Sequence, residues 1–433
     1  MRRVIIAGVM SAAVVLTAAA CSSGSSSSSA AGTVTPTSGT SASSSASAAT
    51  GGGAVALPTP AKPASGTPLK VFFFNEQGAS STASDPGETS AAQAAVDYIN
   101  KNLGGIKGRP IALTTCASLG TAASSASCAN QAVADKADIV IKGVDPEGEA
   151  AVPIITGAGI PYLTLNAGSA AELDNKLAFV PSSGYQAEFG AFAPYAKSKG
   201  YKSVVAIYTN VQALASAVDA MGTAFKEEGI AFTGVPVDIT TADLTSAYSA
   251  ALTKKPDLIV VLTSLAQCTA TLQARQSLGD STPLASGPSC EVPSALGSIP
   301  ASSLGSVVFG AGDTSGVPSD ADTKTYLAAM AAYAPGVTTG GLEPTSFGAV
   351  MDFYNAAKTV ADPATLNAAT IGTLFQTAKS VQLWAGAGQT YSCATHYFAA
   401  SPSACSPWAY VEIRSPSGDI SLVGSYNMST LLH

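Results

Sequence analysis

Short apolar runs rich in strand-forming residues alternate with longer amphipathic stretches along most of this 433-residue chain, in two consecutive series. The runs 69–74 (Leu-Lys-Val-Phe-Phe-Phe) and 258–263 (Leu-Ile-Val-Val-Leu-Thr) are typical of buried strands. Strands that alternate with helices form parallel sheets that helices cover on both faces. The sequence therefore predicts an α/β protein with two doubly wound parallel-sheet lobes.

The first series extends from residue 69 to residue 165, and the second from residue 203 to residue 310. Asp85, Pro86 and Glu88 are typical of a helix start, with Asp as the N-cap and Pro at the first helical position. We expect strands at 69–74, 111–115, 139–142, 162–165, 203–208, 233–238, 258–263, 283–286 and 307–310, and further helices at 122–135, 150–159, 213–228, 244–254 and 266–278.

Two such lobes determine where a ligand would bind. In open α/β sheets, ligands sit beyond the carboxyl ends of the strands. Two lobes that face each other place such a site in the cleft between them.

The start of the chain has the pattern of an export signal. Arg2 and Arg3 precede an apolar run at 4–16, which is too short to span a bilayer, and small residues then lead to Cys21. The segment resembles a bacterial lipobox, in which the cysteine receives lipid, although Ala18 stands where leucine is usual. We expect 1–21 to be a lipoprotein signal peptide whose lipidated Cys21 anchors the protein to the outer face of the cell membrane. An ordinary secreted protein with an unlipidated cysteine is the alternative.

Residues 22–68 consist mainly of Ser, Ala, Gly, Thr and Pro and contain no aromatic residue. Such a segment cannot bury enough apolar surface to offset the entropy of the chain. It is therefore expected to be a disordered tether that holds the folded part away from the membrane.

The charge of the chain argues against nucleic acid as a partner. Charged residues make up 11% of the chain, the net charge is −7, and no cluster of Lys and Arg is present. Phosphate backbones require such clusters.

Six of the seven cysteines remain when Cys21 is set aside, which suits an exported protein. Six cysteines allow fifteen pairings, and pairing between neighbours in the sequence is the simplest. A zinc site is the rival interpretation, but the chain has no Cys-x-x-Cys motif and only two histidines. We predict no metal and the disulfides Cys116–Cys128, Cys268–Cys290 and Cys393–Cys405.

Several motifs, in order, carry a resemblance to a known family. They are 87–111 with Gly-Gly-Ile-Lys-Gly-Arg-Pro-Ile at its end, 158–161 (Ala-Gly-Ile-Pro), 254–259 (Lys-Lys-Pro-Asp-Leu-Ile), 346–351 and the closing segment 409–423. The chain resembles the branched-chain-amino-acid-type binding proteins of ABC transporters, which are type I periplasmic binding proteins. The similarity covers most of 69–433.

The resemblance implies two lobes joined by three crossovers that close like a hinge around a ligand. Lobe one would hold 69–180 and 312–385, and lobe two 181–311 and 386–433. It implies a monomer without a cofactor that captures a small polar solute, such as an amino acid or amide, and delivers it to an ABC permease.

In lobe one, amino-acid binders of the family hold the ligand carboxylate on a Ser-rich turn, which corresponds to 143–148 here. This turn instead contains Asp145 and Glu147, which would repel an anionic group and could attract an amine or accept from hydroxyls. The alternative is that Asp145 shapes the turn and Glu147 favours the start of the next helix.

The loop after the fourth strand supplies further candidates for ligand binding, namely Asn166, Gly168 and Ser169, whose backbone N–H groups suit a polar ligand head. Ser169 could equally be a simple N-cap. Gln77, on the loop after the first strand, is also a candidate.

In lobe two, the family often has Tyr-Gly after the first strand, where this chain has Leu214 and Ala215. Tyr208 and Asn210 lie nearer the strand end and could substitute, although Tyr208 could equally be a core residue.

Two further candidates follow later strands of lobe two. Ser264 follows the strand at 258–263 and should face the cleft. Glu291 lies close to where amino-acid binders keep an acid for the ligand ammonium, and the alternative is a surface Glu on a disulfide loop.

The motifs of the common enzyme classes are absent from the sequence. The chain has no Gly-x-Ser-x-Gly elbow, no Walker loop and no dinucleotide fingerprint, and its two histidines are His396 and the terminal His433. We therefore expect no enzyme, although paired carboxylates in a cleft could act as acid and base. The sequence is also compatible with a ligand sensor that docks on a signalling receptor, and with a purely structural lipoprotein.

Overall fold

The computed structural model describes residues 55–78, 85–291, 297, 299–300 and 304–432. The predicted signal peptide with Cys21, most of the predicted tether, and His433 lie outside these residues. Both sheets described below belong to a single unit of the chain, Gly53–His433.

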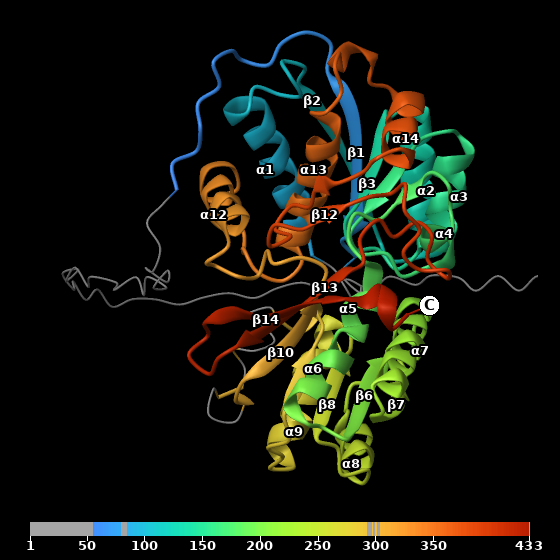
Figure 1. Ribbon diagram of the computed structural model, residues 1–433, viewed down its shortest axis with the longest axis vertical. Helices are drawn as coiled ribbons and strands as arrows, with labels where there is room; N and C mark the ends of the chain where they lie inside the picture. The colour runs from blue at the N-terminus through green and yellow to red at the C-terminus, as the bar shows by residue number, and fades with distance from the viewer. Residues whose placement is uncertain (1–54, 79–84, 292–296, 298, 301–303, 433) are drawn as a thin grey trace, which may run out of the picture. The chain divides into compact units, whose positions relative to one another are not determined.

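The first lobe is built on a five-stranded parallel sheet that helices cover on both faces (Figure 1). Its strands, from edge to edge, are β2 (Ile111–Ser118), β1 (Leu69–Glu76), β3 (Ile139–Lys142), β4 (Tyr162–Thr164) and β5 (Ala178–Phe179). Its helices are α1 (Gly87–Asn102), α2 (Ala122–Ala134), α3 (Gly148–Gly157), α4 (Ala170–Leu173), α12 (Ala321–Tyr333), α13 (Glu343–Ala357) and α14 (Ala368–Gln376).

Side-chain alternation along β1 explains why this sheet is buried on both faces. Phe73 packs in the core cluster that contains α1, α12, α13 and α14, whereas Phe72 and Phe74 pack in the cluster that contains α2 and α3. Successive side chains of a strand point to opposite faces, so a nearly continuous apolar run fills both cores.

The second lobe is built on a seven-stranded sheet. Its strands, from edge to edge, are β14 (Ile420–Asn427), β13 (Trp408–Arg414), β10 (Val307–Ala311), β9 (Leu284–Ser286), β8 (Leu258–Leu262), β6 (Ser203–Thr209) and β7 (Ala231–Val237). The strands from β10 to β7 are parallel, while β13 and β14 are antiparallel and form the closing hairpin.

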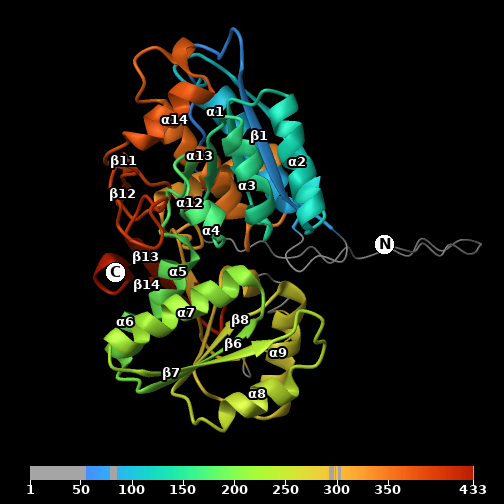
Figure 2. The same cartoon turned by 90° about the vertical axis from the view of Figure 1, so that its right-hand side faces the viewer.

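Helices cover both faces of the second sheet as well. One face packs against α5 (Gly184–Gly190), α6 (Phe192–Lys199) and α7 (Gln212–Glu227), and the other against α8 (Thr245–Leu252) and α9 (Leu265–Ser277). Figure 2 shows α7 on one side of β6 and β8, with α8 and α9 on the other. The two-lobed α/β fold predicted from the sequence is confirmed.

Three local features differ from the sequence-based expectations. The N-cap of α1 is Pro86, and Asp85 instead accepts a hydrogen bond from the backbone N–H of Gly87 at 2.9 Å. The sequence predicts no element at 184–199, where α5 and α6 lie, because Gly184, Gly190 and Pro194 weaken the helical pattern. Burial of this segment against the second sheet stabilises it.

The third difference is at the predicted tether, because its last part, 55–68, packs on the first lobe. Leu57 lies against the core of that lobe, and the side chain of Asn102 donates to the carbonyl of Pro58 at 2.9 Å. The backbone N–H of Ser65 donates to the carbonyl of Gly108 at 2.8 Å. These contacts order a segment whose composition alone predicts disorder.

The chain crosses between the two sheets three times. The first crossover leads from β5 to α5, and the second from β10 to α12. The sequence predicts the third at residue 386, but Tyr391 and Cys405 still pack in the core of the first lobe, and Trp408 begins β13 of the second sheet. The packing therefore favours a third crossover between residues 405 and 408, and the exact division stays a prediction.

The remaining elements are short. A small hairpin and three single turns complete the fold, namely β11 (Val381–Gln382), β12 (Thr390–Tyr391), η1 (Pro288–Cys290), η2 (Pro363–Thr365) and η3 (Met428–Thr430).

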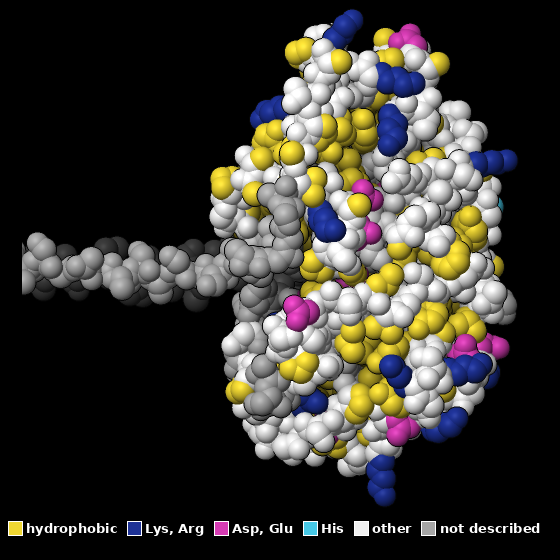
Figure 3. Space-filling model, turned by 60° about the vertical axis from the view of Figure 1, so that its left-hand side comes forward, with side chains coloured by type: hydrophobic (Ala, Val, Ile, Leu, Met, Phe, Trp, Pro, Cys, Tyr) yellow, Lys and Arg dark blue, Asp and Glu magenta, His cyan; other side chains and the backbone are white. Residues whose placement is uncertain are grey.

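The six remaining cysteines pair with their neighbours in the sequence. The disulfides are Cys116–Cys128, Cys268–Cys290 and Cys393–Cys405. Within the described part of the chain, no helix is both long and apolar enough to cross a bilayer. On the face in Figure 3, Lys and Arg side chains are spread over the surface among uncharged residues.

Candidate functional site

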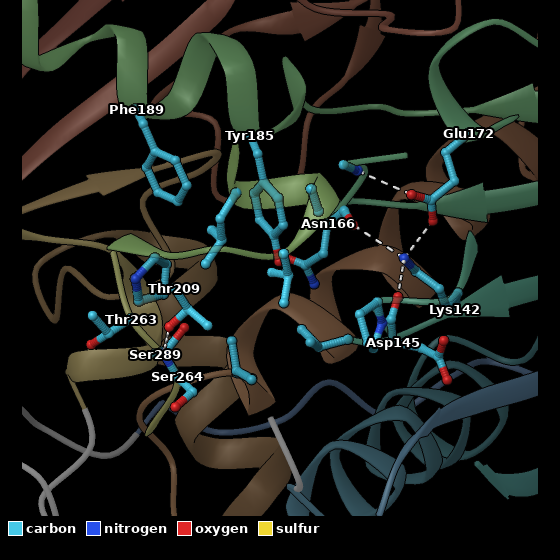
Figure 4. Close-up of a pocket in the computed structure, with 18 residues that line it drawn as sticks. Lys142, Asp145, Asn166, Glu172, Tyr185, Phe189, Thr209, Thr263, Ser264 and Ser289 are labelled. Atoms are coloured by element: carbon cyan, nitrogen blue, oxygen red, sulfur yellow. Dashed lines mark hydrogen bonds and ion pairs between the residues drawn. The ribbon is translucent and has the colours of Figure 1, made fainter. Parts of the chain in front are cut away.

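A pocket lies where parallel strands of both sheets end. Its lining comes from the segments that follow β3 and β4 in the first lobe and β6, β8 and β9 in the second lobe (Figure 4). It encloses about 820 Å³ of empty space, part of which is open to solvent. The described residues that line it are Lys142, Val144, Asp145, Pro146, Asn166, Gly168, Glu172, Tyr185, Phe189, Thr209, Val211, Ala213, Leu214, Thr263, Ser264, Pro288, Ser289 and Leu342.

Lys142, at the end of β3, is the one cationic side chain of this lining, and all three donors of its ammonium have protein partners. Its ammonium forms an ion pair with Glu172, and both side chains are almost completely buried, with 1% and 2% exposed. The same nitrogen donates to the carbonyl oxygens of Asp145 at 3.1 Å and Asn166 at 3.2 Å. An ammonium has three donors, so these partners satisfy all of them.

The carboxylate of Glu172 accepts several hydrogen bonds in addition to its ion pair with Lys142. It accepts from the backbone N–H groups of Gly168 and Ser169, each at 3.0 Å, and from the hydroxyl of Tyr162 at 2.7 Å. Burial alone would raise the pKa of this carboxyl, but the charge of Lys142 and these donors outweigh it and lower the pKa below its ordinary value. Glu172 therefore stays ionised and neutralises Lys142.

The carboxylate of Asp145 is also tied into the first lobe. It accepts hydrogen bonds from the hydroxyls of Ser118 and Ser125, the latter at 2.8 Å, and from the backbone N–H of Glu147 at 2.8 Å. In Figure 4 the Asp145 carboxylate points away from the second-lobe residues Thr209 and Ser264. Asp145 thus shapes the turn at 143–148, which is the second of the two roles that the sequence allows for it.

Aromatic rings from α5 form one wall of the pocket. Tyr185 and Phe189 are one helical turn apart, and their rings stack with centroids 5.5 Å apart and planes 15° apart. The stack continues to Phe192 at 6.5 Å and so joins the core of the second lobe. The inner rings of this wall are buried, with 3% of Phe189 and 0% of Phe192 exposed.

One side chain of the lining, Thr263, has a buried polar atom, its hydroxyl oxygen, without a protein partner among the described residues. Thr209, in contrast, donates to Gln267 at 2.5 Å and accepts from the backbone N–H of Ser264 at 3.0 Å. A buried unpaired hydroxyl is costly, so Thr263 is a natural contact for a bound molecule.

Four of the ten ligand-binding residues predicted from the sequence line this pocket, namely Asp145, Asn166, Gly168 and Ser264. The side chain of Ser264 is the N-cap of α9 and accepts from the N–H of Gln267 at 3.3 Å. Gly168 lies at the contact between the lobes, because a Cβ added there would be 2.6 Å from the Cβ of Ala213.

The other predicted lobe-one candidates lie outside the lining. The side-chain amide of Gln77 donates to Asn75 at 2.9 Å and to Thr89 at 2.6 Å. Ser169 is the N-cap of α4 in a capping box with Glu172. Glu147 is the N-cap residue of α3, and its pKa is raised by burial and by the charge of Asp145.

Three predicted residues of the second lobe also lie outside the lining. The ring of Tyr208 packs against Gly234 of β7, and Asn210 is exposed. Glu291, at the end of η1, lies close to Gly316 of the second crossover. Burial raises the pKa of Glu291 to about 7, although Arg414 lowers it, and the charge of Asp313 raises it further.

Sequence reasoning missed most of the lining. Lys142, Thr209 and Thr263 end or follow predicted strands, so the rule that ligands bind at carboxyl strand ends could have found them. Tyr185 and Phe189 carried no such signal, because the helix that holds them was not predicted. No group of His, Cys, Asp and Glu residues in the described segments is arranged to hold a metal ion.

The sequence places the chain among known proteins. Residues 72–415 match the model of the periplasmic binding protein family. The chain belongs to this family. Periplasmic binding proteins of this kind are extracytoplasmic solute-binding proteins, and the resemblance inferred from the sequence motifs is confirmed. No curated protein matches the sequence.

Solved structures of periplasmic binding proteins share the fold. A fatty acid ABC transporter substrate-binding protein from Thermomonospora curvata has 15% identity and a TM-score of 0.70, over 86% of this chain and 97% of that chain. A branched-chain amino acid transporter substrate-binding protein from Streptococcus pneumoniae, in complex with isoleucine, has 22% identity and a TM-score of 0.64, over 83% and 99%.

A third solved structure holds a different kind of molecule. It is the ABC transporter solute-binding protein from R. palustris in complex with 4-hydroxybenzoate, with 14% identity and a TM-score of 0.66, over 83% of this chain and 97% of that chain. At these identities the similarity shows the shared type I fold alone. The ligand of this chain has to be inferred from the residues of its own pocket.

Proposed function

We propose that this periplasmic binding protein captures a small solute in the pocket between its lobes and delivers it to an ABC permease. The pocket itself supports this proposal most strongly, because its lining comes from the carboxyl strand ends of both sheets. The lining includes Thr263, whose buried hydroxyl has no hydrogen-bond partner among the described residues. The protein acts as a monomer and performs no catalysis.

Closure of the lobes would couple binding to delivery. A solute that contacts Asn166 of the first lobe and Thr263 of the second stabilises the arrangement in which both lobes reach it. Asp145 and Gly168 line the first-lobe side and Ser264 the second-lobe side. The remaining predicted contacts, Gln77, Glu147, Ser169, Tyr208, Asn210 and Glu291, lie outside the lining and are not needed for this proposal.

A lipid on Cys21 would keep the protein at the outer face of the cell membrane, where its permease lies. The lipobox-like sequence before Cys21 and the Ser-rich segment after it support this part of the proposal. The full chain and the Cys21→Ser variant should differ in cell fractionation. We expect the full chain in the membrane fraction and the variant in the soluble fraction, and equal partition of both would contradict the anchor.

A thermal-shift screen of the full chain against amino acids, amides, polyamines, sugars, aromatic alcohols and organic acids tests solute binding. A ligand at 100 times its dissociation constant stabilises the folded state by about 2.7 kcal/mol if it does not bind the unfolded state. We expect one class to raise the melting temperature, and Thr263→Val to reduce this shift. The matched control Thr325→Val alters a hydroxyl on α12, outside the lining, and should leave the shift unchanged. No shift with any class, together with no binding in calorimetry, would contradict the proposal.

A further inference from the structure

We infer that the solute is an uncharged, planar aromatic molecule that carries one or two hydroxyl or amide groups. This inference rests on the proposed function and names the ligand class of the same pocket. It is narrower than the small polar solute expected from the sequence, and it follows from how the charged, apolar and polar parts of the lining are arranged.

No charged group in the described lining is free to pair with a charged ligand. Lys142 has its three donors directed to Glu172 and to two backbone carbonyls, and Glu172 has Lys142 and four further donors. The carboxylate of Asp145 accepts from Ser118, Ser125 and a backbone N–H. A ligand charge placed beside them would be desolvated without gaining a partner, which is strongly unfavourable.

This arrangement bears on three common ligand classes. A free carboxylate, as in a fatty acid or a hydroxy acid, would need a cation, and Lys142 is already neutralised. An ammonium would need acceptors, and the carboxylates of Asp145 and Glu172 are already saturated. An amino acid would need both, so a zwitterion fits this lining worst of all.

The apolar part of the lining is broad and favours a flat body. Tyr185 and Phe189 stack to form a wall with ring planes 15° apart. Around the pocket lie further apolar side chains from both lobes, and aromatic rings stack on one another favourably at such distances. The apolar residues concerned are Val144, Pro146, Val211, Leu214, Pro288 and Leu342.

The polar side chains of the lining that have no hydrogen-bond partner among the described residues are neutral. The hydroxyl of Thr263 is buried without a partner, and the side-chain amide of Asn166 and the hydroxyl of Tyr185 form no hydrogen bond within the described residues. In Figure 4, Tyr185 and Asn166 lie close together, and Thr263 lies on the side of Thr209 and Ser264. These neutral groups can satisfy a hydroxyl or an amide, and each such hydrogen bond adds specificity without charge.

Calorimetry on the full chain in detergent tests this ligand class with small molecules that each carry one aromatic ring and differ in charge. The neutral probes are 4-hydroxybenzyl alcohol, 4-hydroxybenzamide and nicotinamide. The charged probes are 4-hydroxybenzoate, tyramine and tyrosine, with leucine as a non-aromatic zwitterion. We expect at least one neutral probe to bind at least tenfold more tightly than every charged probe.

Two variants test the residues that carry the inference. Tyr185→Leu keeps an apolar side chain but removes the ring, and should weaken the binding of the neutral probe at least tenfold. Tyr426→Leu changes a half-buried tyrosine of β14 outside the lining and should leave the affinity within twofold. Asn166→Asp adds a negative charge with little change in shape. It should reduce the difference in affinity between the cationic tyramine and the neutral 4-hydroxybenzyl alcohol. Circular dichroism of each variant establishes that it is folded.

The outcomes separate the ligand class from the proposed function. Binding of leucine, tyrosine, tyramine or 4-hydroxybenzoate as tightly as the neutral probes would overturn the inference and leave solute binding intact. If none of the three neutral probes binds, the inferred ligand class is wrong as well. Failure of every class in the wider screen would overturn the proposed function itself.

Discussion

At the scale of single residues, the buried pair of Lys142 and Glu172 decides what the pocket can hold. A lysine at the end of a buried strand is unfavourable unless its charge is paired. Glu172 supplies that charge from the first turn of α4, and the capping box of that helix keeps its carboxylate in place. The pair therefore cancels the one positive charge in the described lining.

Removal of one member of this pair should be costly. We expect Glu172→Gln to lower the free energy of unfolding by about 3 kcal/mol, because the variant leaves a buried ammonium without a counter-charge. Urea unfolding at pH 7 measures the loss. The control Asp97→Asn breaks the surface pair with Lys101, whose side chain is 56% exposed, and should cost less than about 1 kcal/mol.

The same pair has a defined pH dependence. The pKa of Glu172 is lower in the folded state than its ordinary value, so its contribution is present above the ordinary pKa of a glutamate and is lost as the pH falls through the lower folded value. A loss of stability for Glu172→Gln that is the same at pH 3 and pH 7 would contradict this assignment.

Gly168 is a second residue whose size matters, because it lies where the lobes approach. A Cβ at this position would come within 2.6 Å of Ala213 and 3.1 Å of the Tyr185 ring. We expect Gly168→Ala to weaken ligand binding at least tenfold in calorimetry, because the added methyl group holds the lobes apart. Gly157→Ala, at the end of α3 with no atom within 4 Å of the added Cβ, is the matched control and should bind normally. Equal affinities would show that the contact at Gly168 is not part of closure.

At the scale of elements, two of the disulfides differ in what they connect, one lying within a lobe and the other next to a crossover. Cys116–Cys128 joins β2 to α2 within the first lobe. Cys393–Cys405 closes a loop at the third crossover, where the backbone N–H of Cys405 donates to the carbonyl of Val180 on the first crossover at 2.8 Å. The disulfide-closed loop 393–405 therefore connects two of the three crossovers.

These two disulfides form a matched pair for experiment, because each closes a loop with a sequence separation of 12. In the chain-entropy model each stabilises the fold by about 3 kcal/mol. We expect Cys116→Ala with Cys128→Ala, and Cys393→Ala with Cys405→Ala, to lose similar stability in urea unfolding. Only the second double variant should also change the ligand dissociation constant. A change of affinity in both, or in neither, would argue against a mechanical role for the loop 393–405.

At the scale of the whole molecule, buried carboxyl groups gather around the second crossover. Glu188 of α5 lies near Gly312, and Glu412 of β13 lies near Gly316, so the two carboxyl groups flank this segment. Burial raises the pKa of Asp313 to about 6, and the charge of Asp320 adds to the rise while hydrogen bonds from Ser315 oppose it. Burial also raises the pKa values of Glu188 and Glu412 well above the ordinary range.

These shifts predict that the fold is more stable in mild acid. A carboxyl group with a raised pKa in the folded state binds more protons there than in the unfolded state, so stability falls as the pH rises. Asp313, with a pKa of about 6, and Glu291, with a pKa of about 7, place the change between about pH 4 and pH 7. Urea unfolding at pH 5, 6 and 7.5 should show this fall.

Variants that replace these carboxyl groups with amides should reduce the dependence of stability on pH. We expect Glu291→Gln and Asp313→Asn to be less sensitive to pH than the parent chain over this range. Asp219→Asn alters an exposed carboxylate of α7 and should not change the profile. A parent chain whose stability rises between pH 5 and pH 7.5 would contradict the prediction.

The sequence by itself determined the class of fold and the pairing of the six cysteines other than Cys21. Leu69–Glu76 and Leu258–Leu262 are buried strands, as expected from their short, mainly apolar runs of strand-forming residues, which are typical of strands that helices cover on both faces. The cysteines pair with their neighbours because the segments that carry them pack together locally. Motif order was also sufficient to identify the family.

Only the tertiary structure decided which residues line the candidate site and how their charges are paired. The charge of Lys142 is cancelled by Glu172, 30 residues later, and the aromatic wall comes from α5, whose helix is stabilised by burial against the second sheet. Asp145 has the sequence of a ligand contact, yet Ser118 and Ser125 bind its carboxylate. Sequence patterns record local preference and periodicity, whereas neutralisation and exposure depend on partners that only the folded chain brings together.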